Sequence, residues 1–302
     1  MKSPYLEQAR LMLRILPHVA KEKCFALKGG SAINFFRRDM PRLSVDIDLT
    51  YVPVGVRDDA LEGIGEALKR IKTGISKALP GTAIHESLSA GHVFKLVVRG
   101  DGAQVKIEPN TVIRGTIEPP VERALSAKVE NKFGLSVYAW IAADSDLYGG
   151  KICAALDRQH PRDLFDIKLL LSGEVLTAQV RKGFVVYLAS HDRPIHELLD
   201  PNRKDMKAVY DSEFLGMTDA PVTYEELVET RERLIARLKT DLTDAEKKFL
   251  ISVKEGRPDW DLMGLPGIER LPAIQWKLQN IRKMNKAKHQ DQLLKLRSKL
   301  GL

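Results

Sequence analysis

The sequence is poor in cysteine, in aromatic residues and in long apolar runs. Its 302 residues include two cysteines and 6% aromatic residues. Cys24 and Cys153 both lie among apolar neighbours, which excludes a disulfide framework or a zinc cluster and is typical of buried thiols in a reducing compartment. No run approaches the ~18 apolar residues that cross a bilayer, and the first residues lack the apolar core of a signal peptide. We therefore expect a cytoplasmic protein without a membrane partner.

Internal repeats and low-complexity tracts are also lacking, and acidic residues are scarce at one end of the chain. With 44% hydrophobic and 29% charged residues, the composition is that of one large or two ordinary globular domains. The net charge is +8, and residues 271–302 hold eight Lys and Arg against one Asp, or +7. A basic helical stripe indicates a polyanion partner, although a solvated charged helix end has the same pattern.

A glycine turn between a short apolar strand and a helix is the first motif. Residues 25–27 are apolar, as a buried strand should be. Gly29 and Gly30 permit a sharp turn and close approach of the backbone to a ligand. The helix expected over residues 32–36 begins with unpaired amides. Together with the Ser31 hydroxyl, these amides form a cradle for phosphate.

Two acidic residues follow in the segment 42–49. Asp46 and Asp48 stand two positions apart, so on a strand they point to the same face, with Ser44 beside them. Adjacent carboxylates repel unless a cation lies between them, and Mg2+ takes one or two carboxylates together with substrate phosphates. A phosphate cradle beside such a pair is suited to moving a nucleotidyl group. The alternative is a solvated Asp-x-Asp at a strand end and an ordinary glycine turn.

The two motifs together, Gly-Gly-Ser at 29–31 and Ser-x-Asp-x-Asp at 44–48, resemble the signature of the polymerase-β-like nucleotidyltransferases. The resemblance implies a third carboxylate from a neighbouring strand, and Glu108 is the candidate. The family more often has Asp at this position. Glu108 is equally consistent with an ordinary polar residue at a strand end beside Pro109.

The order of the remaining elements predicts an α+β fold. Together with this order, the resemblance implies an N-terminal polymerase-β-like nucleotidyltransferase core with a mixed sheet and helices, residues 1–125, and a largely helical C-terminal domain, residues 126–302. Residues 113–137 are expected to form a connecting strand and loop. The apolar spacing and turn residues predict helices over 6–20 and 57–79, strands over 82–86, 92–99 and 104–109, and a hairpin turn at 99–102.

Two helix starts in the C-terminal third carry a capping box. Thr223 with Glu226, and Thr243 with Glu246, have the spacing at which each side chain bonds the other residue's backbone amide. The pattern predicts helices that begin at both places.

A second group of candidate residues lies in the helical part. Lys151 ends the run Asp-Leu-Tyr-Gly-Gly-Lys and is expected to project from a face of small residues, where a lysine can neutralise a triphosphate as pyrophosphate leaves. Asp163 and Asp166 share one face of the next helix. Asp166 is suited to orienting Lys151, accepting a proton or contacting metal. Ordinary structural roles are the alternative: Asp163 complements the helix dipole, and Arg162 pairs with Asp166.

Asp-Leu-Tyr-Gly-Gly-Lys at 146–151 and Pro-Arg-Asp-Leu-Phe-Asp at 161–166 closely resemble two motifs of the AbiEii family of nucleotidyltransferase toxins. The similarity extends from about residue 24 to 285. The resemblance places the family's lysine and last aspartate at Lys151 and Asp166. The candidate residues are, for catalysis, Asp46, Asp48, Lys151 and Asp166; for nucleotide and phosphate, Gly29, Gly30, Ser31 and Ser44; for metal, Asp46, Asp48 and Glu108; and for RNA, Lys277, Arg282, Lys283 and Lys286.

These residues predict an enzyme that uses Mg2+ or Mn2+ to move NMP from an NTP to a hydroxyl, releasing pyrophosphate. The resemblance implies the 3′ end of tRNA as acceptor, the role of toxin in a type IV toxin–antitoxin or phage-defence pair, and a cognate winged-helix antitoxin. The alternatives are an enzyme that transfers AMP or UMP to protein, and a catalytically idle module that binds RNA or the antitoxin. Clustered carboxylates facing a polyanion count against the idle module.

Overall fold

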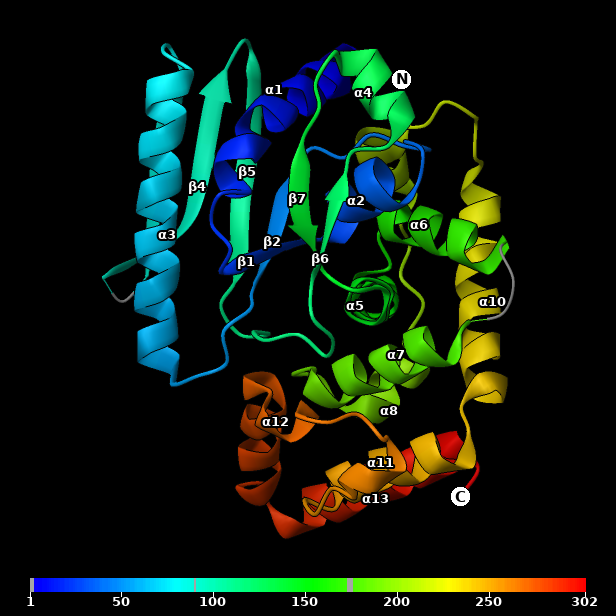
Figure 1. The fold of residues 1–302 in the computed structure, drawn as a ribbon. Helices are drawn as coiled ribbons and strands as arrows, with labels where there is room; N and C mark the ends of the chain where they lie inside the picture. The colour runs from blue at the N-terminus through cyan, green and yellow to red at the C-terminus, as the bar shows by residue number, and fades with distance from the viewer. Residues whose placement is uncertain (1–2, 90, 173–175) are drawn as a thin grey trace. The chain divides into compact units, whose positions relative to one another are not determined.

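The computed structural model describes residues 3–89, 91–172 and 176–302, and the chain divides into two compact units (Figure 1). The first unit comprises Met1–Ala143 and Leu215–Pro221, and the second Asp144–Phe214 and Val222–Leu302. The expected boundary near residue 125 therefore lies inside the first unit. The reason is a strand beyond that residue, β7 (Tyr138–Ile141), which pairs with a central strand of the first unit's sheet.

Within the described residues of the first unit, seven strands form a mixed sheet in the order β3-β4-β5-β2-β1-β7-β6. The pairs β2·β5 and β1·β7 are parallel, and the other four pairs are antiparallel. The other strands are β1 Phe25–Lys28, β2 Ile47–Tyr51, β3 Ala83–Ser89, β4 His92–Gly100, β5 Ala103–Asn110 and β6 Val121–Ala124. The helices are α1 Ser3–Val19, α2 Gly29–Ala32, the π-helix η1 Ile33–Arg37, α3 Arg57–Ala78 and α4 Ala127–Phe133.

The alternation of buried and half-buried residues along β5 follows the sequence pattern. Residues of β5 alternate between buried and half-buried, so its apolar side chains face the core. The hairpin expected at 99–102 joins β4 to β5, with Asp101 and Gly102 in the left-handed region at φ +52° and +73°. The helix α1 packs against β5, and α3 packs against β4 (Figure 1). The predicted helices over 6–20 and 57–79 are confirmed.

The stretch 113–137 contains more structure than its sequence pattern indicates. It includes the edge strand β6 and the helix α4, where a connecting strand and loop were expected. Both elements are short, and β6 is mostly exposed. Neither therefore carries a long hydrophobic repeat in the sequence. The α+β fold itself is confirmed.

In the second unit the described residues form helices connected by turns. The helices are α5 Asp144–Arg158, α6 Pro161–Ser172, α7 Ala178–Ser190, α8 Ile195–Leu199, α9 Lys207–Val209, the π-helix η2 Tyr210–Phe214, α10 Tyr224–Asp241, α11 Asp244–Lys254, the 3-10 helices η3 Trp260–Leu262 and η4 Ile268–Arg270, α12 Pro272–Arg282 and α13 Lys286–Leu300. Both predicted capping boxes are confirmed: Thr223 begins α10 and Thr243 begins α11.

Two glycines let α5 and α7 approach until their backbones touch. A Cβ on Gly149 would lie 2.5 Å from the carbonyl carbon of Gly183, and a Cβ on Gly183 would collide with the carbonyl oxygen of Ser145. Only glycine fits at either position, because the colliding atoms belong to backbone. Gly149 belongs to the run that ends at Lys151, so this crossing fixes the helix that carries the lysine.

None of the helices within the described residues combines the length and the hydropathy that crossing a bilayer requires.

Candidate active site

The turn after β1 brings Gly29 against Asp48. Gly29 has φ +68°, a left-handed conformation that favours glycine. A Cβ at this position would also collide with Oδ2 of Asp48. Glycine is therefore favoured by the backbone angle at this position, and a larger residue would displace the carboxylate of Asp48.

Gly30 makes room for two polar side chains that approach from the segment before β2. A Cβ on Gly30 would lie 2.6 Å from a terminal nitrogen of Arg42 and 2.9 Å from Oγ of Ser44. Arg42 is 2% exposed and donates a hydrogen bond to the carbonyl oxygen of Leu43 at 2.8 Å. The predicted phosphate cradle is thus lined in this structure by the chain's own guanidinium and hydroxyl groups.

Ser31 links the start of α2 to the segment that carries the two carboxylates. Its hydroxyl lies 3.0 Å from Oγ of Ser44 and 2.5 Å from the carbonyl oxygen of Asp46, to which it donates. Ser31 is 1% exposed, so these contacts are shielded from water. The hydroxyl positions the backbone next to Asp46, and its contact with a phosphate oxygen stays a prediction.

Asp46 and Asp48 are half-buried at the start of β2. The strand begins at Ile47, so Asp46 precedes it and Asp48 lies within it. Asp48 is the cross-strand neighbour of Lys28, the last residue of β1. We refer to Gly29, Gly30, Ser31, Arg42, Ser44, Asp46 and Asp48 as the glycine-turn cluster.

Glu108 is the parallel-strand neighbour of Asp48 in the β2·β5 pair. Its carboxylate forms an ion pair with Lys95 at 2.5 Å. Among the residues that the structure describes, no group of three or more His, Cys, Asp or Glu side chains is placed to hold a metal ion. The donor chemistry of Asp46 and Asp48 still fits Mg2+ or Mn2+, because such ions complete their shells with water and substrate phosphates.

In the second unit, Lys151 lies between two carboxylates. Its ammonium nitrogen is 2.9 Å from Oδ1 of Asp163 and 3.0 Å from Oδ2 of Asp166. Arg158 contacts the other oxygen of Asp163 at 2.8 Å. The side chains of Lys151, Asp163 and Asp166 are at most 6% exposed. These four residues are called the buried ion cluster below.

The charges of the buried ion cluster balance, with two cations and two anions. Burial by itself would raise the pKa of Asp163, but the charges of Lys151 and then Arg158 outweigh it and lower that pKa below its ordinary value. Asp163 therefore stays ionised and holds Lys151 in place. An ion pair between Arg162 and Asp166 was the expected structural alternative to a catalytic role of Asp166. In the structure, Arg162 instead lies 3.4 Å from Glu213.

A hydrogen bond between α7 and α5 supports the helix of Lys151. The Tyr187 hydroxyl donates to Oδ1 of Asp146 at 3.2 Å, and both residues are buried. Burial, followed by the charge of Asp146, raises the pKa of Tyr187 well above its usual range, so the phenol remains a donor.

The basic C-terminal segment divides into buried, paired and exposed cations. Lys277 is 8% exposed, and its ammonium donates to the carbonyl oxygens of His191 and Arg193 at 2.6 Å, just after α7. This corrects the expectation of a surface lysine: Lys277 is a buried group that binds the end of a helix. The other predicted RNA-binding residues, Arg282, Lys283 and Lys286, are exposed.

Three further cations of this segment are held by acids that lie far away in the sequence or one helical turn away. Lys295 pairs with Asp291, Arg297 with Glu255 and Lys299 with Asp200. The sequence count of +7 therefore overstates the basic surface, because its acidic partners lie partly outside the segment.

Arg42 is the residue of the glycine-turn cluster that the sequence analysis missed. The signal was available, because residues 42, 44, 46 and 48 continue the same two-residue spacing. Arg158 was missed in the buried ion cluster, and no local pattern marks it as the partner of Asp163. The clusters lie in different units, and each is described separately.

The chain resembles known proteins both in its fold and in its sequence. The chain matches a solved structure, MenT4, a nucleotidyltransferase toxin from Mycobacterium tuberculosis, with a TM-score of 0.59 and 15% identity over 98% of this chain and 95% of that one. This likeness shows a shared fold. No curated protein matches the sequence of this chain. The family model described as nucleotidyl transferase AbiEii toxin, type IV TA system, matches residues 10–280. The chain therefore belongs to the AbiEii family of nucleotidyltransferase toxins.

Proposed function

We propose that this nucleotidyltransferase moves a nucleoside monophosphate from an NTP to the 3′ hydroxyl of tRNA, with a divalent cation held by Asp46 and Asp48. The observation that carries the proposal is the glycine-turn cluster. It combines two half-buried carboxylates with a backbone turn whose left-handed angle at Gly29 favours glycine. Family membership supports the reaction class and the NTP substrate.

In the proposed reaction the tRNA hydroxyl oxygen attacks the α-phosphorus of the NTP. The bond from that phosphorus to the bridging oxygen breaks, pyrophosphate leaves, and the hydroxyl proton passes to solvent or a nearby carboxylate. Mg2+ or Mn2+, when bound, would activate the hydroxyl and offset charge on the leaving group. Glu108 joins the metal ligands in this proposal if its carboxylate leaves Lys95.

The chain's own residues then position the reactants. Ser31 and Ser44 orient the segment that carries Asp46, and Arg42 supplies positive charge beside Gly30. Lys151 is proposed to offset charge on the triphosphate, and Asp163 and Asp166 hold its ammonium in one place. Fixed groups of this kind reduce the reorganisation that the transition state requires.

Different observations support the proposed RNA acceptor and the proposed antitoxin partner. Exposed Arg282, Lys283 and Lys286 fit an RNA backbone, and we keep these three residues as the RNA-binding proposal without Lys277. The toxin class supports an antitoxin partner, for which we propose a winged-helix protein. We further propose that the enzyme acts in the cytoplasm, where its tRNA and NTP substrates are found.

Transfer of label from each α-32P-labelled NTP into total tRNA, with protein as the competing acceptor, tests the proposal. Label in tRNA that Asp46→Asn abolishes supports it. Asp58→Asn is the matched control, because its side chain is 88% exposed in the first turn of α3. Label in protein instead of tRNA would establish the AMP- or UMP-transferring alternative. Absence of transfer from every NTP would favour the alternative of a catalytically idle binding module.

A further inference from the structure

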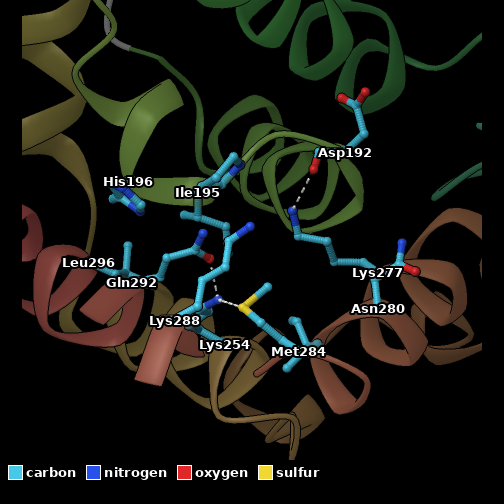
Figure 2. Close-up of a pocket in the computed structure, with 12 residues that line it drawn as sticks. Asp192, Ile195, His196, Lys254, Lys277, Asn280, Met284, Lys288, Gln292 and Leu296 are labelled. Carbon is cyan, nitrogen blue, oxygen red and sulfur yellow. Dashed lines mark hydrogen bonds between the residues drawn. The ribbon is translucent and has the colours of Figure 1, made fainter. Parts of the chain in front are cut away.

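A pocket of about 210 Å3 lies in the second unit, lined by residues of α8, α11, α12 and α13 (Figure 2). This volume is below the ~300–1,000 Å3 of sites for drug-sized ligands. It is room for about seven water molecules at ~30 Å3 each. The pocket therefore fits a small ion or one chemical group of a larger ligand. Its polar lining includes Lys254, Lys277, Asn280, Lys288 and Gln292.

Lys254 is a buried cation in this pocket with only neutral acceptors. It is 5% exposed, and its ammonium lies 2.6 Å from Oε1 of Gln292 and 3.6 Å from Sδ of Met284 (Figure 2). No carboxylate in the described residues forms an ion pair with it. A buried charge without a counter-charge costs stability, and an anion entering the pocket would offset that cost.

The lysines in the pocket lining, Lys254, Lys277 and Lys288, outnumber its one carboxylate, Asp192. Lys288 lies in the first turn of α13, where the helix dipole disfavours a cation and where no acidic residue is present. Burial, followed by the charge of Lys288, lowers the pKa of Lys254. The lining carboxylate, Asp192, is 87% exposed and contacts His191, and Figure 2 shows it directed away from the lysines.

We propose that this pocket binds a phosphate-class anion, with Lys254 and Lys288 supplying charge and the amides of Asn280 and Gln292 supplying hydrogen bonds. The oxygen of Gln292 accepts from Lys254, which leaves its NH2 group to donate to the anion. The phosphate belongs either to a free ion, such as phosphate or pyrophosphate, or to the backbone of RNA. The pocket shares no residue with either cluster described above, and the proposal does not depend on nucleotidyl transfer.

The test measures binding to the full chain and to two variants. Inorganic phosphate and pyrophosphate are titrated by calorimetry in a phosphate-free buffer, and tRNA by fluorescence anisotropy at fixed salt. Lys254→Met removes the buried charge and keeps the length of the side chain. Lys248→Met is the matched control, because Lys248 is an exposed lysine on the same helix.

We expect Lys254→Met to weaken binding of the cognate anion at least tenfold, while Lys248→Met changes it less than twofold. Loss confined to phosphate or pyrophosphate identifies a free ion, and loss confined to tRNA identifies RNA. Absence of binding by all three probes, or equal binding by Lys254→Met and the control, would overturn the proposal.

Thermal unfolding adds a readout that a purely structural lysine would not give. Lys254 ends α11, where the dipole favours a cation, so a structural role predicts a lower Tm for Lys254→Met. An anion site predicts the reverse in the phosphate-free buffer: the variant melts at a higher temperature than wild type. It also predicts that phosphate raises the Tm of wild type and of Lys248→Met more than that of Lys254→Met. General salt stabilisation would raise all three equally.

Discussion

The glycine-turn cluster and the buried ion cluster differ in how far their carboxylates are exposed and in how they are paired. Asp46 and Asp48 keep part of their surface open and lie at a strand start, beside a turn built from glycines. Asp163 and Asp166 are closed off from water and held by Lys151 and Arg158. The open cluster is suited to exchanging ligands, whereas the ions of the closed one already pair with one another. We therefore expect substitutions in the first to cost activity, and substitutions in the second to cost stability first.

The largest effect on stability is expected from Lys151→Met. The change leaves two buried carboxylates with Arg158 as their remaining cation in the cluster, and breaking a buried pair costs about 3–5 kcal/mol. Urea unfolding followed by circular dichroism measures the loss. Arg158→Met is the comparison variant: its side chain is 61% exposed although its partner Asp163 is buried, so we expect a smaller loss than for the buried Lys151. Equal losses for both variants would remove the distinction between the two cations.

Gly29→Ala separates backbone strain from displacement of Asp48. The left-handed angle costs an alanine about 1–2 kcal/mol. Gly102→Ala meets the same cost at φ +73°, but a Cβ there has nothing within 4 Å. Unfolding should show similar destabilisation for both variants, while the labelled-NTP assay should show loss of transfer for Gly29→Ala alone. Full transfer by that variant would contradict the role of Asp48.

The pH dependence of the free energy of unfolding tests whether ionised Asp163 stabilises the fold through the buried ion cluster. Its pKa is lowered in the folded chain, so below about pH 4 the unfolded chain binds more protons. This contribution is complete above about pH 5 and is lost as the pH falls, by at most about 1.4 kcal/mol per pH unit. The free energy of unfolding of wild type should fall more steeply between pH 4 and 3 than that of Asp163→Asn. Parallel curves would mean that Asp163 gains nothing from its partners.

The smallest effect is expected at the basic surface. Replacing Arg282, Lys283 and Lys286 by Gln should reduce the slope of log affinity for tRNA against log salt by about 2, at ~0.7 per phosphate contact on a single strand. Lys295→Gln should change the slope little, because its charge is already paired with Asp291. Anisotropy at several salt concentrations measures both. An unchanged slope in the triple variant would remove these residues from the RNA proposal.

Local patterns predicted much of the fold and the content of each cluster. The hairpin at 99–102, the helices α1 and α3 and the capping boxes at Thr223 and Thr243 each depend on residues close in sequence. The acidic pair and its glycine turn were likewise visible as spacing. Membership of the AbiEii family, inferred from the motif around Lys151, is confirmed by the family match.

Residue identity and spacing specify which chemical groups are present and the local elements that carry them, because periodicity and capping act over a few residues. The tertiary structure alone decided their partners. It buried Lys277 on the carbonyls after α7, paired Glu108 with Lys95, and joined Arg297 to Glu255. It also set β7 beside β1, beyond the expected domain boundary. These contacts depend on packing between segments that are distant in sequence, and no spacing rule encodes them.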